Sequence, residues 1–313
     1  MSTEERIVTL SNEQTQELID KLRVALDSAK QRGLNLVAVG RTGVGKSSTI
    51  NALMGSELAP VGRFEPTTTS VEKYKTVLNG IPCTLADTPG LCEQEFTPAE
   101  NSDYLRKLME SVKTVDCLLF VTQLNFNRVD NCEKSVVRDL STILQAKIWS
   151  SAIIVFTHAN TIKADSYNET FTVRTRLIRE EIAKYAPGVA DSVPAIAIDT
   201  TSTTAPDGAT WLPELYMAVI RRLPPDGVMP YIIATKPDLS TMSPKDIQDI
   251  TSRLPRDEGS GFGDTLAFLY TTVGPGFFIG SVIGGPVGGA IGAVLGPAAL
   301  IVVGLAEKIK NNK

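Results

Sequence analysis

The segment from Gly40 to Ser47 contains the residue types that bind a phosphate chain. It reads Gly-Arg-Thr-Gly-Val-Gly-Lys-Ser and lies between a strand pattern at 34–39 and a helical pattern at 46–54. Its glycines let backbone N–H groups approach phosphate oxygens at the start of a helix. We predict that Lys46 contacts the β and γ phosphates and that Ser47 ligates Mg²⁺. The predicted phosphate-binding residues are Gly40, Arg41, Thr42, Gly43, Val44, Gly45, Lys46, Ser47 and Ser48.

A second motif, Asp87-Thr88-Pro89-Gly90, follows the next apolar strand pattern. We predict that Asp87 holds magnesium through a water and that the Gly90 amide contacts the γ-phosphate. Between the two motifs lies a threonine run in which one hydroxyl is expected to close over Mg²⁺ while the γ-phosphate is present. Thr68 is favoured, with Thr67 next and Thr69 still open. Lys46, Thr68 and Gly90 are therefore the predicted catalytic residues in the chain's own site.

The base side of the predicted pocket has an unusual composition. Guanine presents N1–H and an exocyclic amine, so its site needs a carboxylate acceptor. The strand at 152–157 leads into Thr157-His158-Ala159-Asn160, which lacks the expected lysine and aspartate. Asp199, at the end of the next strand, is the better acceptor, and the His158 ring is expected to pack on the purine. The predicted base-side residues are His158, Asn160 and Asp199.

A literal Thr235-Lys236-Pro237-Asp238 occurs further along the chain. This tetrapeptide has the residue pattern usually used to bind guanine. It comes after the last strand and helix of the expected nucleotide fold, so it would need a rearranged topology to reach the base. We therefore interpret it as lying outside the pocket.

These residues resemble the Toc GTPases, import receptors of the chloroplast outer envelope that are related to the immunity-associated GTPases and the septins. The resemblance implies that a histidine packs on guanine and that an acidic residue recognises the base edge. Here those residues are His158 and Asp199, where the family more often has Glu, and Asn160 replaces the usual Gln. The similar stretches, over about residues 34–222, are Gly40–Ser47, Pro66–Val71, Asp87–Leu91, Arg128–Asn131, Ile148-Trp149, Thr157–Ala159 and Asp207–Pro213.

The same resemblance implies a homodimer that forms across the nucleotide face. In the family the arginine of an Arg-Val-Asp segment approaches the partner's phosphates, and that arginine is Arg128 here. Leu91 follows the second motif where many small GTPases have a water-orienting glutamine. We therefore predict slow intrinsic hydrolysis of GTP to GDP that a residue of a second copy accelerates.

Alternating strand and helix patterns from 34 to 223 predict an α/β P-loop domain with a mostly parallel sheet covered by helices on both faces. The strands are expected at 34–39, 71–78, 81–86, 115–121, 152–157 and 195–198, and the helices at 46–54, 98–113, 130–146, 171–186 and 211–222. We predict an N-terminal amphipathic helix at 1–33, a G domain at 34–223, a linker at 224–264 and a hydrophobic helical segment at 265–313.

The composition excludes several other classes of protein. A net charge of −4 over 313 residues argues against a nucleic-acid partner. The chain has one histidine, and its four cysteines form no CxxC pair, which argues against a zinc site. We expect reduced thiols, two of them on core strands.

The segment from Thr265 to Ala306 contains no charged residue. Glycines recur at every fourth position from Gly276 to Gly296, a spacing that lets helices approach closely in lipid. We predict membrane association through this segment, as a kinked single span or a short hairpin, with the G domain facing the cytosol. The leading functional prediction is thus a membrane-anchored, dimerising GTP switch. A nucleotide-controlled membrane-remodelling or pore-forming protein and a soluble GTP-binding scaffold are the alternatives.

Overall fold

The computed structural model describes residues 24, 27–55, 72–87, 106, 114–237, 242–254, 282–283 and 290–291. The chain divides into two compact units, one formed by 34–76 with 83–223 and the other by 1–33, 77–82 and 224–313. Each unit is described by itself. Thr68, Gly90 and Leu91, and most of the segments predicted as helices at 1–33 and 98–113, lie outside the described residues.

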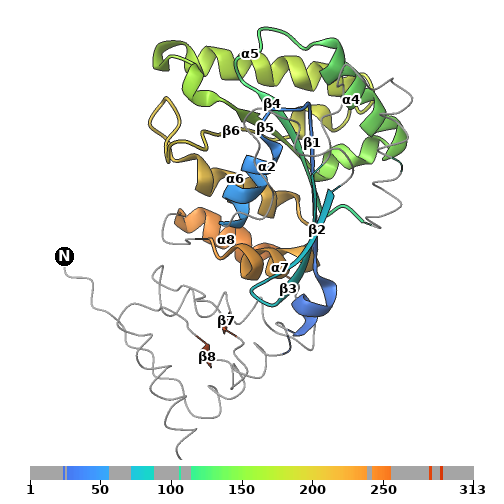
Figure 1. The fold of residues 1–313 in the computed structure, drawn as a ribbon, viewed down its shortest axis with the longest axis vertical. Helices are drawn as coiled ribbons and strands as arrows, with labels where there is room; N and C mark the ends of the chain where they lie inside the picture. The colour runs from blue at the N-terminus through green and yellow to red at the C-terminus, as the bar shows by residue number, and fades with distance from the viewer. Residues whose placement is uncertain are drawn as a thin grey trace, which may run out of the picture. The chain divides into compact units, whose positions relative to one another are not determined.

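A six-stranded sheet in the order β2-β3-β1-β4-β5-β6 forms the centre of the fold (Figure 1). The pairs β1–β3, β1–β4, β4–β5 and β5–β6 are parallel. β2 and β3 are joined by Asn79-Gly80, whose φ angles of 50° and 85° suit a two-residue hairpin turn and make this pair antiparallel. The strands are β1 (Leu34–Val39), β2 (Glu72–Leu78), β3 (Ile81–Asp87), β4 (Cys117–Gln123), β5 (Ala152–Thr157) and β6 (Ala195–Ala197).

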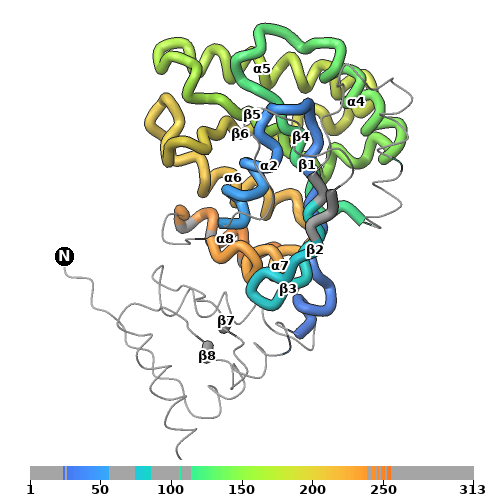
Figure 2. Tube along the Cα trace, in the orientation of Figure 1, coloured from blue at the N-terminus to red at the C-terminus, as the bar shows by residue number. Residues whose placement is uncertain are grey.

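Helices cover both faces of the sheet, which confirms the predicted α/β P-loop class. Helices α2 and α6 lie on one side, and α4 and α5 on the other (Figures 1 and 2). The helices of this unit are α2 (Lys46–Met54), α4 (Asn131–Ile143), α5 (Ala164–Ala183) and α6 (Trp211–Arg222), with 3₁₀ turns η1 (Ala146–Ser151), η2 (Ala159–Thr161) and η3 (Ala190–Ser192).

The core lies along β4 and β5, whose residues are buried almost without interruption. A strand buried on both faces has a continuous apolar sequence, as Ala152–Phe156 does. Alternate residues such as Phe120 and Ile154 pack with α4 and α5 in one cluster. Each fully buried aliphatic or aromatic side chain contributes about 2 kcal/mol, so this layer fixes the strand ends on which the site is built.

The described cysteines are free thiols. Cys83 on β3 and Cys117 on β4 are buried, and Cys132 is partly buried. Burial raises the pKa of the Cys117 thiol, which keeps it protonated. The expectation of reduced thiols with two on core strands is confirmed for these three residues.

Some predicted boundaries were wrong. The strand expected at 115–121 is β4 at 117–123, because Asp116 instead accepts a hydrogen bond from Asn35 N and ends the preceding loop. Helix α5 begins at Ala164 rather than near 171, since its polar first turns show no helical apolar stripe. The helix expected to reach residue 146 ends at 143, and Gln145 has a left-handed φ of 64°.

The second unit contains helices α7 (Pro225–Thr235) and α8 (Pro244–Arg253) in the segment expected as a linker. Pro225 and Pro244 each occupy the first turn, where a missing N–H costs nothing. Nearly all of α7 is buried, so apolar packing supports the helix despite Pro230. Thr235 and Lys236 of the Thr-Lys-Pro-Asp tetrapeptide end this helix, within the unit that does not contain the P-loop.

Two other contacts organise this unit. Arg32 pairs with Asp226 at 3.2 Å, and Asn79 Nδ2 donates to Ala234 O at 2.9 Å. Residues 27–32 are helical and Gly33, with φ of 67°, ends them, so the predicted stop at Gly33 is confirmed.

Only four residues of the predicted hydrophobic helical segment at 265–313 are described. They form β7 (Val282–Ile283) and β8 (Ala290–Ile291), which pair antiparallel, so helix is the wrong expectation for these residues. Three of the four are β-branched, which favours an extended backbone. Among the helices that the structure describes, none has the length and apolar character needed to cross a bilayer.

Candidate nucleotide site

The loop between β1 and α2 has the backbone shape that phosphate binding requires. Gly43 and Gly45 have left-handed φ angles of 73° and 94°, which glycine adopts at little cost. A Cβ on Gly40 would lie 2.1 Å from Val121 O, so only glycine fits against β4 at that position. The three glycines of the motif are thus each required by the geometry.

The first turn of α2 points its backbone N–H groups into this loop. Gly45 is the N-cap and provides no side-chain acceptor, and the first turn carries no acidic residue. The positive end of the helix dipole is therefore left for an anionic ligand. Lys46 Nζ donates to Arg41 O at 3.0 Å, which holds the ammonium across the loop. Ser47 is the second residue of the same helix, where a hydroxyl can reach a metal bound to the phosphates.

Thr157, at the end of β5, connects the phosphate loop to the base side. Its Oγ1 lies 2.6 Å from Val44 O and 3.0 Å from His158 Nδ1. Both a backbone carbonyl of the P-loop and a ring nitrogen of the histidine are thus within hydrogen-bonding distance of this one hydroxyl. Thr157 therefore helps to orient the His158 ring.

His158 has a left-handed φ of 57°, a conformation that is uncommon for a residue with a Cβ. The residue precedes η2 and follows a strand whose six residues are all buried. Local strain of this kind persists where the surroundings impose it, often at binding sites. The backbone thus turns sharply at the position where the sequence predicted a ring against the purine.

The end of β6 lies beside the end of β5. Ile198 N donates to Phe156 O at 2.7 Å, and Ala159 N donates to Ile198 O at 3.4 Å. This pairing sets Asp199, which follows β6, next to the segment that carries His158. The doubly covered sheet thus brings together two residues that are far apart in the sequence.

Asp199 is 5% exposed and one of its oxygens, Oδ1, accepts from Thr201 N and Thr201 Oγ1 at 2.9 and 2.6 Å. Asn160 Nδ2 donates to the same threonine hydroxyl at 3.1 Å. Asn160 and Asp199 are therefore joined through Thr201 in one small network, while His158 contacts Thr157. Among the described residues none donates to Asp199 Oδ2, which leaves an acceptor for N–H groups of a base.

The magnesium side is described only in part. Asp87 is the last residue of β3, and Ala38 is its partner on β1, so β3 ends beside the strand that leads into the P-loop. Ser47, in the helix that follows β1, and Asp87, at the end of the neighbouring β3, are oxygen-bearing residues of the kind that bind Mg²⁺. Thr68 lies outside the described residues. Within the described part of the chain, no three His, Cys, Asp or Glu residues gather to hold a metal.

Arg128 lies in the loop between β4 and α4 and is exposed. It makes no hydrogen bond or ion pair with another described residue, so its guanidinium is available. Two residues later, Asp130 caps α4 and pairs with Arg41 Nη1 of the P-loop at 3.1 Å. The Arg-Val-Asp segment is therefore tied to the phosphate loop.

Sequence reasoning assigned no role to Thr157, Gln123 or Asp130. Gln123 Nε2 donates to Gly43 O of the P-loop at 3.4 Å from the end of β4. Gln123 and Thr157 could have been found from the sequence, because each is a polar residue at the carboxyl end of a parallel strand. Asp130 also begins an Asp-x-x-Glu capping box.

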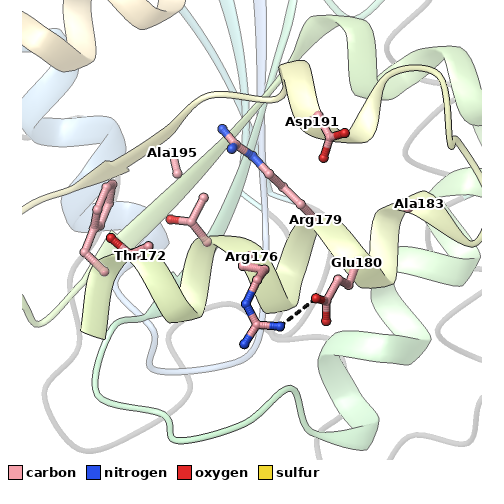
Figure 3. A pocket seen from close by; sticks show the side chains of 9 residues that line it. Thr172, Arg176, Arg179, Glu180, Ala183, Asp191 and Ala195 are labelled. Atoms are coloured by element: carbon pink, nitrogen blue, oxygen red, sulfur yellow. Dashed lines mark hydrogen bonds and ion pairs between the residues drawn. The ribbon is translucent and has the colours of Figure 1, made fainter. Parts of the chain in front are cut away.

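A separate cavity of about 520 Å³ lies between α5 and the segment from η3 to β6. Figure 3 shows its labelled side chains, including the Arg176–Glu180 pair and Arg179. Arg179 Nε and Nη2 both donate to Val193 O. None of the predicted nucleotide-binding residues lines this cavity.

Comparisons with known proteins agree with this geometry. Residues 34–185 match the model of the AIG1 family. The chain is 33% identical over 165 residues to GTP-binding protein A of Dictyostelium discoideum, covering 52% of the chain and 36% of that protein. It is 28% identical over 220 residues to translocase of chloroplast 34 of Pisum sativum, covering 64% of the chain and 70% of that protein. The chain thus spans about a third of the length of the first relative and more than two thirds of the second.

Two crystal structures have the same fold. Toc33 from Arabidopsis thaliana in complex with GDP and Mg²⁺ gives a TM-score of 0.53 at 23% identity, over 72% of this chain and 97% of that one. The second structure is of chloroplast translocon components and is described as showing that dimerisation is important for the GTPase activity of atToc33 and psToc159. Its TM-score is 0.52 at 24% identity, over 68% of this chain and 94% of that one.

Proposed function

Residues 34–185 match the AIG1 family model and the chain resembles Toc-type P-loop GTPases, and from that premise we propose that it is a GTP-hydrolysing switch whose two copies meet across the nucleotide face. The observation that carries this proposal is the exposed Arg128 beside Asp130, which pairs with Arg41 of the P-loop. A partner that docks there inserts a cation close to the phosphates of the first copy.

The nucleotide is a guanine nucleotide. The P-loop amides and Lys46 bind its phosphates, and His158 and Asp199 bind its base. Toc33 with GDP and Mg²⁺ supports the same ligands here. Ser47 and Asp87, with Thr68, would hold Mg²⁺, which neutralises charge that develops on the β and γ phosphates. The buried Asp199 carboxylate favours guanine because it accepts hydrogen bonds where adenine offers no donor.

Hydrolysis is expected to be slow in the isolated chain. The position after the Asp-Thr-Pro-Gly motif is Leu91, which cannot orient a water by hydrogen bonding. A guanidinium supplied by a second copy stabilises the charge on the transferring phosphoryl group. Arg128 is the residue that we assign to this role, and the importance of dimerisation for the GTPase activity of atToc33 and psToc159 supports it.

The test compares Arg128→Ala with Arg138→Ala, which removes another exposed arginine on α4. GTP turnover per molecule is measured over a range of protein concentrations, with sedimentation to follow the dimer. We expect wild type and Arg138→Ala to become more active as dimers form. Arg128→Ala should bind GDP normally and show no such rise. Equal concentration dependence and equal dimerisation in both variants would contradict the proposal.

We also propose that the chain attaches to a membrane through the uncharged run at 265–306. Its length supports this, because the core of a bilayer accepts an uncharged segment long enough to cross it. Attachment would place the switch on the cytosolic surface. The same run favours, as a second candidate, a protein that permeabilises the bilayer under nucleotide control.

Carbonate extraction and vesicle leakage separate these possibilities. The full chain should stay with anionic vesicles after carbonate treatment, and a chain truncated after residue 260 should be released. Leakage of a trapped dye that requires GTP would favour the permeabilising protein. Recovery of the full chain in the soluble fraction would contradict membrane attachment and favour a soluble GTP-binding scaffold.

A further inference from the structure

A buried ion pair lies directly behind the nucleotide loops. Glu133 of α4 and Arg174 of α5 are 4% and 1% exposed, and Arg174 Nη2 lies 2.7 Å from Glu133 Oε1. Neither residue is among the predicted nucleotide-binding residues. The pair connects two helices on the same face of the sheet.

Glu133 links this pair to the P-loop through the start of α4. Its carboxylate accepts from Thr122 Oγ1 of β4 and, at 3.1 Å, from Asp130 N. Asp130 in turn accepts from Glu133 N at 2.8 Å and pairs with Arg41 at 3.1 Å. The position of Glu133 therefore sets the position of the Asp130 carboxylate and, through it, the Arg41 side chain.

Arg174 reaches the same loop by a second route. Its Nη2 also contacts Gln123 O at 3.5 Å, and its guanidinium lies 5.7 Å from the centre of the Phe156 ring. Gln123 Nε2 donates to Gly43 O. Phe156 immediately precedes Thr157, which bonds to Val44 O. One side chain thus contacts the ends of β4 and β5, both of which touch the P-loop.

The pair is not arranged to maximise stability. Nε and Nη1 of Arg174 are buried without a hydrogen-bond partner among the described residues. Buried donors left unpaired cost free energy, and buried ion pairs are often no more stabilising than apolar side chains of similar size. A role in fixing geometry accounts for the pair better than stability alone.

We propose that Arg174 is a positioning residue that, through Glu133 and Asp130, holds the P-loop and the Arg128 segment in the geometry that retains nucleotide and completes hydrolysis. The part of this inference that concerns Arg128 rests on the proposed dimer. The part that concerns nucleotide retention rests on the contacts of a single copy.

The experiment removes both charges so that no ion is left buried alone. The double variant Glu133→Gln, Arg174→Met in the full chain keeps a glutamine able to complete the capping box. Its thermal midpoint should equal or exceed that of wild type. We expect fluorescently labelled GDP to dissociate about tenfold faster, measured at protein concentrations below those at which dimers form. The rise of GTP turnover with concentration should also be reduced.

The matched control is Arg176→Met, Glu180→Gln, which removes an exposed ion pair on the same helix, α5, by the same substitutions. It should leave GDP dissociation and turnover unchanged. Arg174→Lys keeps a cation beside Glu133 but loses the planar guanidinium that lies by the Phe156 ring, so its GDP dissociation should lie between wild type and the double variant.

A double variant as stable as wild type, with unchanged GDP dissociation, would overturn the positioning role. If the double variant does not fold, Arg174→Lys is decisive. A rate of GDP dissociation in that variant equal to the wild-type rate would also overturn the positioning role. A wild-type chain that shows no concentration-dependent turnover would instead contradict the dimer proposal, and the dissociation measurement would still decide the role of Arg174.

Discussion

The phosphate side and the base side of this site are built in different ways. The proposed phosphate side is one continuous loop, 40–47, in which backbone N–H groups and glycine conformations would do most of the binding. The proposed base side is assembled from the ends of β5 and β6, and it would depend on the side chains of His158, Asn160 and Asp199. A backbone site tolerates few changes of shape, whereas a side-chain site can change its specificity by single substitutions.

The largest effect is expected at Gly40. A Cβ there would lie 2.1 Å from Val121 O, so Gly40→Ala must push the loop away from β4. We expect the free energy of unfolding to fall by about 1–3 kcal/mol and GTP binding to be lost, as measured by denaturant titration and fluorescence binding. Gly188→Ala is the control, because nothing lies within 4 Å of its added Cβ. Normal GTP binding by Gly40→Ala would show that the loop shape is not decisive.

Asp199→Asn tests whether the base side sets specificity. Asparagine keeps the Oδ1 acceptor for Thr201, but its amide faces the donor groups of guanine. GTP affinity should fall about 100-fold, close to the cost of losing hydrogen bonds to a charged group. Xanthosine triphosphate, which has a carbonyl in place of the guanine amine, should bind better than GTP. Competition binding measures both, with the exposed Asp191→Asn as control. An unchanged preference for GTP would remove Asp199 from the base pocket.

Thr157→Val tests the connection between the two sides. The substitution keeps the shape but removes the hydrogen bonds to Val44 O and His158. GDP affinity should fall about tenfold, since each such bond contributes roughly 1 kcal/mol. Thr170→Val removes a hydroxyl that bonds Ser166 O on α5 and should leave affinity unchanged. Equal affinities for the two variants would mean that the phosphate and base sides act independently.

The smallest effect is expected at Asn160. Its exposed hydrogen bond to Thr201 is 3.1 Å long, so Asn160→Ala should lower GTP affinity by no more than about threefold. Isothermal titration is sensitive enough to measure this. A loss above tenfold would indicate that Asn160 contacts the base directly rather than through Thr201.

The two sides also differ in how well the sequence predicts them. The phosphate loop and its flanking strand and helix could be predicted because the contributing residues are consecutive and their glycines report the backbone shape. Asp199 could be placed only by assuming the order of β5 and β6. The sequence predicts Thr157 as the end of a strand. Its hydrogen bond to Val44 O joins residues 113 positions apart, and no local sequence pattern predicts that contact.

The parts that sequence reasoning missed have similar physical causes. The first turns of α5 are mostly polar, with Tyr167 as their one buried side chain, so they carry little periodic apolar signal. Helix α7 contains Pro230 and was expected within a linker, although its burial compensates for the lost hydrogen bond. In the sequence, Glu133 and Arg174 look like two ordinary surface charges, because only the packing of α4 against α5 buries them.

The shortness of β6 has a consequence for how copies of the chain associate. This strand supplies three residues to one edge of the sheet. An edge of that length offers few backbone groups to a strand of a neighbouring molecule, so open-ended strand addition gains little free energy. The proposed pair of copies that meet across the nucleotide loops would instead be a closed dimer, to which no third copy can be added in the same way. A short edge strand thus disfavours open-ended assembly at this edge of the sheet.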